Sequence, residues 1–172
     1  GDKALEAQIV ANRANARIDL GELEQALDDY RQAVDLYRSV GEKRGEGQVL
    51  SYIGGTHGLL GQHRRALEYY EPALAALRAI DHSFQAVVHH RRGTAYWKLG
   101  DYPAALAAYD EALVFWRKHG LSYGVAMTLA ETAAVLIDRD QAGDRERAAQ
   151  LLDEAKDTAR HLRGRAFDAQ RK

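Results

Sequence analysis

The chain has 172 residues, of which 46% are hydrophobic and 28% are charged, and its 24 Lys and Arg against 25 Asp and Glu leave a formal net charge of -1. This balance gives no overall attraction to nucleic acid or to an anionic membrane. Cysteine is absent, which excludes disulfides and thiolate metal sites. Because no apolar run approaches the roughly 18 residues of a membrane helix, we expect a cytoplasmic protein, or a piece of one.

A pattern of small and aromatic residues occurs four times along the chain. In each copy a glycine is followed by alanine after five residues, by tyrosine or leucine after nine and by alanine after twelve. The copies begin at Gly21, Gly61, Gly100 and Gly143. A period near 40 residues with a helical pattern inside each unit is typical of stacked helical hairpins.

Intrinsic propensity favours helix nearly everywhere, because Ala, Leu, Arg, Glu and Gln outnumber the β-branched residues. Apolar residues recur at i, i+3 or i+4, and i+7, as on the buried face of a helix. The glycine that begins each copy suits a left-handed C-cap between two helices. The sequence therefore predicts an all-α chain of eight helices. They run over about residues 3–20, 22–39, 43–60, 63–80, 83–99, 102–118, 122–138 and 145–162.

The two prolines of the chain have different expected effects. Pro103 falls in the first turn of a predicted helix, where the missing N–H has no intrahelical partner to lose. Pro72 falls inside the predicted helix 63–80. We expect it to kink or weaken that helix, by about 3 kcal/mol in an unadapted site.

The segments Gly61 to Leu77 and Gly100 to Trp116 resemble the tetratricopeptide repeat family. GDYPAALAAYDEALVFW has the Gly-Asp-Tyr turn of the family, followed by its small, aromatic and second small residues. The long period resembles the repeats of kinesin light chains, spindle-orientation adaptors and bacterial signalling ATPases. The resemblance implies a right-handed α-solenoid of four helix-turn-helix repeats, at about residues 3–40, 43–80, 83–119 and 122–162. We expect one domain over residues 1–163 and a short basic tail over 164–172.

The recurring small residues have an expected role in packing. The alanine five residues after each glycine is predicted to lie where two helices cross at about 8–10 Å. Gly54 and Gly93 are expected to allow the same close approach from the first helix of their units. The tyrosines Tyr30, Tyr70 and Tyr109 are expected to fill the gap against the next unit.

The resemblance also implies that the first helix of each unit lines a concave wall that binds a protein or peptide. This predicted wall is rich in groups that hydrogen-bond amides, stack, or pair with carboxylates. Its members are Gln8, Asn12, Asn15, Asp19, Gln48, Ser51, Tyr52, Gly55, His90, Arg91, Thr94, Trp97 and Lys98. Asn12 and Asn15 resemble the asparagines with which family members hold an extended peptide, and Arg91 and Lys98 are expected to take its carboxylates. The fourth unit offers a predicted apolar wall of Leu129, Ala130, Ala133 and Leu136 for a helix or for the tail of the chain.

Other chemistries have weak signals. The adjacent His89 and His90 point about 100° apart on a helix, so they do not easily ligate one ion. A phosphate loop requires a preceding strand and a following Lys-Ser/Thr pair, and the glycines between residues 45 and 61 have neither. Acids such as Asp28 and Asp29 are expected on outward, solvated faces. We therefore predict no catalysis, no metal and no cofactor.

The leading hypothesis is a protein-interaction scaffold that holds an extended peptide or a partner helix in the concave groove. An alternative is a sensor or regulatory segment of a larger bacterial signalling protein, such as an ATPase, a transcriptional regulator or a caspase-like protease. A third is self-association, with a homodimer formed through the end repeats. The chain itself is expected to bind neither nucleic acid nor a membrane.

Overall fold

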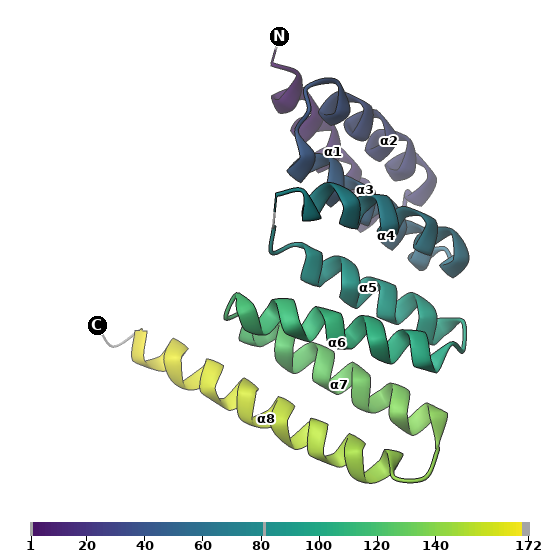
Figure 1. Ribbon diagram of the computed structural model, residues 1–172. Coiled ribbons are helices and arrows are strands. Elements are labelled where there is room, and N and C mark those ends of the chain that lie inside the picture. Colours follow the sequence, from purple (N-terminus) through teal and green to yellow (C-terminus); the bar gives the residue numbers. More distant parts are fainter. Residues whose placement is uncertain (1, 81, 170–172) are drawn as a thin grey trace.

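The computed structural model describes residues 2–80 and 82–169, with side chains through residue 161. Within these residues the chain forms eight α-helices and no strand, which confirms the predicted all-α class (Figure 1). The helices are α1 (Lys3–Asp19), α2 (Leu23–Ser39), α3 (Lys43–Leu59), α4 (His63–Arg78), α5 (Gln85–Lys98), α6 (Tyr102–Lys118), α7 (Ser122–Arg139) and α8 (Asp144–Ala169).

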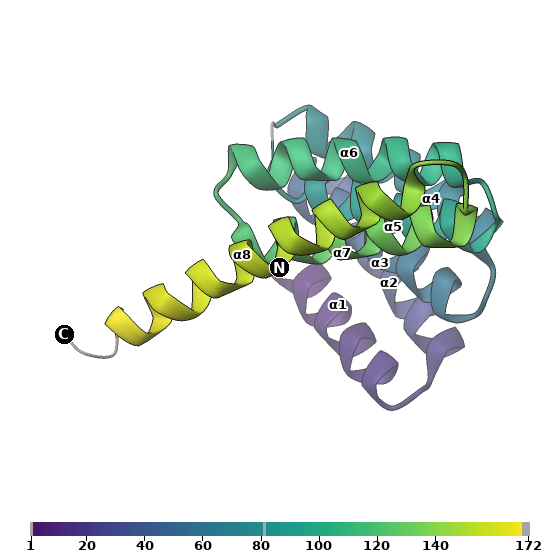
Figure 2. The ribbon, with the colours of Figure 1, turned by 90° about the horizontal axis from the view of Figure 1, so that it is seen from below.

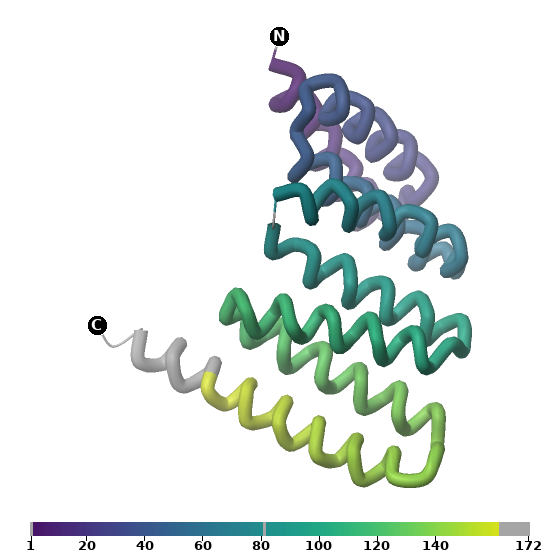
Figure 3. Tube along the Cα trace, in the orientation of Figure 1, coloured from purple at the N-terminus to yellow at the C-terminus, as the bar shows by residue number. Residues whose placement is uncertain are grey.

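Consecutive helices pair into four hairpins, α1 with α2, α3 with α4, α5 with α6 and α7 with α8, and each hairpin packs on the next. The first helices of neighbouring hairpins also touch, because α1 contacts α3 and α3 contacts α5. The tube in Figure 3 shows the first and last hairpins at opposite ends of the stack, and Figure 2 shows α8 in front of α7. The molecule is therefore a solenoid with one wall built from the first helices.

The last helix is longer than its predicted span. The sequence pattern ended this helix at residue 162, whereas α8 runs to Ala169. The segment predicted as a basic tail therefore begins inside a helix, and its residues 170–172 lie outside the described part of the chain. Among the described residues, no helix has both the length and the apolar character needed to cross a membrane.

The turn at Gly100 shows how the sequence closes a hairpin. Gly100 has φ +77°, in the left-handed region predicted for this C-cap. Asp101 follows and accepts a 3.2 Å hydrogen bond from the Ala104 backbone N–H at the start of α6. Pro103 lies in this first turn, as predicted. The glycines that begin the other three copies of the pattern also have positive φ.

The core follows the repeat. The crossing alanines Ala26, Ala66 and Ala105 are fully buried. A Cβ atom on Gly93 would lie 2.6 Å from the Tyr109 ring, and a Cβ on Gly54 would meet Tyr70 in the same way. Each tyrosine therefore packs on the glycine of the first helix in its own hairpin, a contact that requires the missing Cβ.

One expectation about the acidic residues is wrong. Asp28 is exposed as expected, but Asp29 is only 5% exposed, because it lies on the face of α2 that crosses α1. Two arginines of α1 compensate the buried charge: Arg13 binds Asp29 through two hydrogen bonds of 2.7 and 2.9 Å, and Arg17 lies 2.9 Å away. The hydrogen bonds from Arg13 lower the pKa of Asp29, and its burial opposes them.

Candidate peptide-binding groove

A groove of about 1180 Å³ crosses the first helices of all four hairpins. Most of its lining lies in the last part of α1 (residues 15–19), the second half of α3 (52–59), most of α5 (87–98) and the beginning of α7 (122–127). The second helices add Tyr30, His63, Tyr70 and Trp116, and the turn before α7 adds Gly120 and Leu121. The groove therefore crosses the helices obliquely. The members of the predicted wall that line it are Asn15, Asp19, Tyr52, Gly55, His90, Arg91, Thr94 and Lys98.

The other members of the predicted wall lie elsewhere. Gln8 and Asn12 are exposed on the earlier turns of α1, before the helix reaches the groove, and Gln48 occupies the corresponding part of α3. Ser51 is completely buried beneath the groove. Trp97 packs beside α6 and donates a 2.8 Å hydrogen bond from Nε1 to Asp138 Oδ2 of α7. The oblique course of the groove separates these residues from the members that line it.

Arg91 is an oriented cation in the floor of the groove. Its Nη1 donates to the Ser51 backbone oxygen at 3.1 Å and to Ser51 Oγ at 3.0 Å. Its Cζ lies 5.3 Å from the centroid of the Tyr52 ring, and the guanidinium passes beside Gly55, where a Cβ atom would make an ordinary contact of 3.6 Å with Nη1. Among the described residues, no carboxylate forms an ion pair with this guanidinium. Arg91 is therefore held in place by uncharged groups, with N–H donors left over for a ligand.

Asn15 is fixed in a similar way at the α1 end of the groove. The hydroxyl of Tyr30 donates a 2.5 Å hydrogen bond to Asn15 Oδ1. Burial raises the pKa of Tyr30 to about 12, so this hydroxyl keeps its proton at neutral pH. Because Oδ1 is occupied by Tyr30, the amide nitrogen of Asn15 is the group left to bind a peptide carbonyl.

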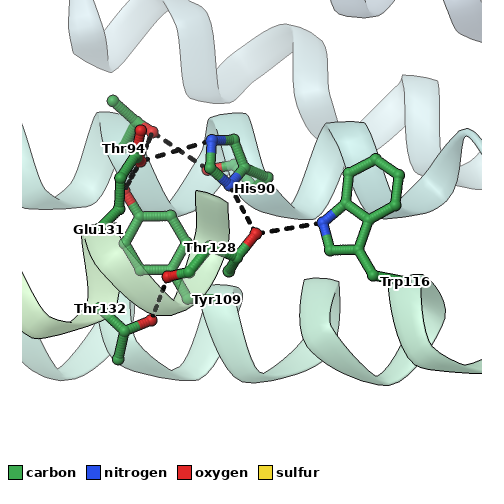
Figure 4. A network of polar contacts seen from close by, with 7 residues as sticks. All are labelled: His90, Thr94, Tyr109, Trp116, Thr128, Glu131 and Thr132. Atoms are coloured by element: carbon green, nitrogen blue, oxygen red, sulfur yellow. Dashed lines mark hydrogen bonds and ion pairs between the residues drawn. The ribbon is translucent and has the colours of Figure 1, made fainter. Parts of the chain in front are cut away.

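A buried polar network lies under the groove and joins α5, α6 and α7 (Figure 4). Thr128 Oγ1 accepts a 3.1 Å hydrogen bond from Trp116 Nε1 and lies 3.0 Å from His90 Nδ1. On the other side of the ring, His90 Nε2 lies 3.4 Å from Glu131 Oε2. When the Thr128 hydroxyl donates to His90 Nδ1, the proton of the neutral ring is on Nε2. This Nε2–H then donates to Glu131. The network thus fixes the orientation of two groove residues, His90 and Trp116.

Glu131 is the acceptor of this network. The Tyr109 hydroxyl lies 2.7 Å and Thr94 Oγ1 lies 3.2 Å from its Oε2 atom. Burial alone would raise the pKa of Glu131, but the hydrogen bonds from His90, Tyr109 and Thr94 outweigh it and lower this pKa. Thr128 and Glu131 were not among the predicted site residues. No local pattern marks them, because their partners on α5 are 37 to 38 residues away in the sequence and those on α6 are 12 to 22 residues away.

The two adjacent histidines have different neighbours. The His89 ring stacks on Phe115, with centroids 5.6 Å apart, and its Nδ1 lies 2.8 Å from Glu111 Oε2. Burial lowers the pKa of His89, against the effect of Glu111. His90 turns instead toward Thr128. Within the part of the chain that the structure describes, no group of three or more His, Asp or Glu side chains could hold a metal ion.

The predicted apolar wall of the fourth unit is wrong. Leu129, Ala133 and Leu136 are fully buried in the core, and Ala130 is exposed outside the groove. These positions were assigned to the groove from family geometry, but the face of α7 that carries the leucines packs on the neighbouring helices. Instead, α7 and the turn before it line the groove with Gly120, Leu121, Ser122, Tyr123, Gly124 and Met127.

Several solved structures share this fold. BtubC from P. vanneervenii superposes with a TM-score of 0.82 at 21% identity, over 95% of this chain and 67% of that one. A Rap protein complexed with Competence and Sporulation Factor gives a TM-score of 0.81 at 19% identity, over 92% of this chain and 44% of that one. A signal-transduction ATPase from Pyrococcus horikoshii that has a tetratricopeptide repeat sensor gives a TM-score of 0.81 at 20% identity, over 98% of this chain and 26% of that one.

Curated relatives are also similar in sequence. The photosystem I assembly protein Ycf3 of Cuscuta gronovii is 32% identical over 100 residues, and that of Rippkaea orientalis is 30% identical over 105 residues. The alignments cover 57% of this chain and 58% and 56% of those proteins, so the chain spans just over half the length of these relatives. Two family profiles, both described as tetratricopeptide repeat, match residues 5–79 and 86–115. The chain belongs to the tetratricopeptide repeat family.

Proposed function

We propose that this chain holds an extended, acidic segment of a partner protein in its groove, with Arg91 binding a carboxylate of that segment. Tetratricopeptide repeat proteins mediate protein–protein interactions. The proposal that the bound segment is acidic depends on the chemistry of the groove. The observation that carries it is the partly buried Arg91 guanidinium, which has hydrogen bonds to Ser51 but no acidic partner among the described residues. A partly buried cation gains most from a ligand that brings the opposite charge.

The rest of the groove favours the same kind of ligand. Lys98 also lines it, so the lining has two cations, Arg91 and Lys98, against one carboxylate, Asp19. The local charge is therefore positive although the whole chain carries a formal charge of -1. Asn15 adds an amide donor for a peptide carbonyl, as hydrogen bonding along an extended backbone requires.

The similar proteins support a role in binding. One solved relative is a Rap protein in complex with Competence and Sporulation Factor, and the curated relatives are named as assembly proteins. Their likeness supports partner binding in general, and the acidic ligand proposed here is argued from the groove. The sensor-segment and self-association hypotheses, and the cytoplasmic location, stay predictions.

The experiment is a binding titration with fluorescein-labelled peptides of glycine and serine that contain either two glutamates or two glutamines. We expect the glutamate peptide to bind the wild-type chain and the Arg91→Gln variant to bind it about 10- to 100-fold more weakly. Arg64→Gln is the matched control, because Arg64 is exposed on α4 and does not line the groove. Equal affinity of the Arg91→Gln variant and the wild type would refute the proposal, provided that circular dichroism shows both to be folded.

A further inference from the structure

The groove has a second half with different chemistry, on the side of α7. Its wall is formed by Val87 on α5, Trp116 near the end of α6, Leu121 just before α7, and Tyr123 and Met127 at the beginning of α7. We name these five residues the apolar subsite. Tyr123 is 73% exposed and Leu121 is 43% exposed. Large apolar side chains thus remain open to solvent inside a concave surface, where a ligand could cover them.

The apolar subsite has a rigid back wall. The Trp116 ring packs on the backbone of Gly124, where a Cβ atom would lie 2.3 Å from Cδ2 of the ring. The indole Nε1 donates to Thr128 Oγ1 at 3.1 Å (Figure 4). Both contacts hold the indole in one orientation. Because the wall is already ordered, a ligand side chain would lose little affinity to its rearrangement.

The apolar subsite lies next to the cation that is proposed to bind a carboxylate. Val87 and Arg91 line the groove from consecutive turns of α5, so their backbone positions are about 6 Å apart along the helix axis. In an extended peptide, residues two apart point to the same side and are about 7 Å apart. The two backbone spacings are similar, so one extended ligand has the length to present an acidic and an apolar side chain to this stretch of α5. The acidic side chain must reach toward α3, where the Arg91 guanidinium contacts Ser51 and Tyr52, and the apolar one toward α7.

We propose that the partner segment carries a large apolar side chain two residues from the carboxylate that binds Arg91, and that this side chain occupies the apolar subsite. The proposal rests on the proposed function and adds the second half of the recognition motif. A partner segment with one acidic and one aromatic or leucine-like residue fits the charge and the apolar surface together. A basic segment would meet Arg91 and Lys98 with like charge.

The test uses four labelled peptides of glycine and serine. Two carry a glutamate and a phenylalanine two residues apart, one in each order, and two matched peptides have serine in place of phenylalanine. We expect at least one phenylalanine peptide to bind wild type about tenfold more tightly than its serine partner, because burial of an aromatic side chain is favourable by that order.

Variants of the protein locate the effect. Val87→Thr keeps the side-chain shape but replaces a methyl group with a hydroxyl, and Tyr123→Ala removes a wall side chain that is 73% exposed. Each variant is expected to weaken binding of the tighter phenylalanine peptide about three- to tenfold and to leave the serine peptide unchanged. Val114→Thr is the control, because Val114 is 64% exposed on α6 and does not line the groove.

The outcomes separate this inference from the proposed function. Suppose that Arg91→Gln abolishes binding, but that phenylalanine and serine peptides bind equally well to wild type, Val87→Thr and Tyr123→Ala. The inference about the apolar subsite is then wrong, and the proposed binding of an acidic peptide stands. If Arg91→Gln leaves the peptide affinity unchanged, both the proposed function and the inference are wrong. A wild-type chain that sediments as a dimer, and a Tyr123→Ala variant that sediments as a monomer, would show that a second copy covers the apolar subsite and would overturn the inference.

Discussion

The hydroxyl of Tyr109 on α6 donates a 2.7 Å hydrogen bond to the carboxylate of Glu131 on α7, and so joins the third hairpin to the fourth (Figure 4). Burial raises the pKa of Tyr109, so the hydroxyl stays protonated. Tyr109 therefore has two functions: its ring packs on Gly93 in its own hairpin, and its hydroxyl binds Glu131 in the next one.

The first prediction concerns this bond. Tyr109→Phe keeps the ring but leaves Glu131 with one donor fewer, so the free energy of unfolding should fall by about 1–2 kcal/mol. Urea denaturation followed by circular dichroism would measure the change. Tyr123→Phe is the control, because Tyr123 is 73% exposed and should show no loss. Equal losses in both variants would mean that the Tyr109–Glu131 bond does not stabilise the junction.

The second prediction is a pH dependence at the same junction. The pKa of Glu131 is lower in the folded chain than its ordinary value, because its hydrogen bonds outweigh its burial. A carboxylate of this kind stabilises the fold above its unfolded pKa, and this contribution is lost as the pH falls through the usual range near 4.5 to the lower folded pKa. Wild type should therefore be more stable than Glu131→Gln at pH 7, and the difference should shrink toward pH 3. A difference that grows on acidification would contradict the assignment.

The third prediction compares two helical glycines. Gly93→Ala would place a Cβ 2.6 Å from the Tyr109 ring, whereas Gly58→Ala would meet no atom within 4 Å. We expect Gly93→Ala to destabilise the fold by about 1–3 kcal/mol through overpacking. Gly58→Ala should stabilise it by up to about 1 kcal/mol, because alanine has the higher helix propensity. If both variants shift the urea midpoint in the same direction, the close Gly93–Tyr109 contact is not what selects glycine.

The sequence predicts the hairpins well, because their signals are local. Gly100 and Asp101 specify a turn within a few residues, and the spacing from Gly93 to Tyr109 recurs from Gly54 to Tyr70. The groove is predicted only in part. Which wall residues share it depends on how successive hairpins are rotated, and this rotation places the groove away from the early turns of α1 and α3.

The sequence predicts that the repeat tyrosines face the next hairpin, but it does not predict the partners of the polar contacts between hairpins. Thr128 and Glu131 meet His90 and Thr94 across nearly 40 residues, and no local spacing encodes such a pair. The prediction for Asp29 was wrong for a related reason. The pattern of an amphipathic helix predicts that a charged residue is solvated, whereas Asp29 is buried because α1 places Arg13 and Arg17 beside it. A periodic pattern identifies the buried face by its apolar members, so it misses buried charges that are paired.

The last prediction concerns Pro72, which lies inside α4 although the helix continues from His63 to Arg78. Proline has no N–H for the carbonyl of Glu68, four residues earlier, and its ring crowds that carbonyl. Pro72 is exposed, so its replacement removes no buried contact. Pro72→Ala should raise the free energy of unfolding by about 1–3 kcal/mol, measured as a higher melting temperature. The matched control is Pro103→Ala, which should change little because Pro103 lies in the first turn of α6. An unchanged melting temperature for Pro72→Ala would show that α4 already accommodates its proline without cost.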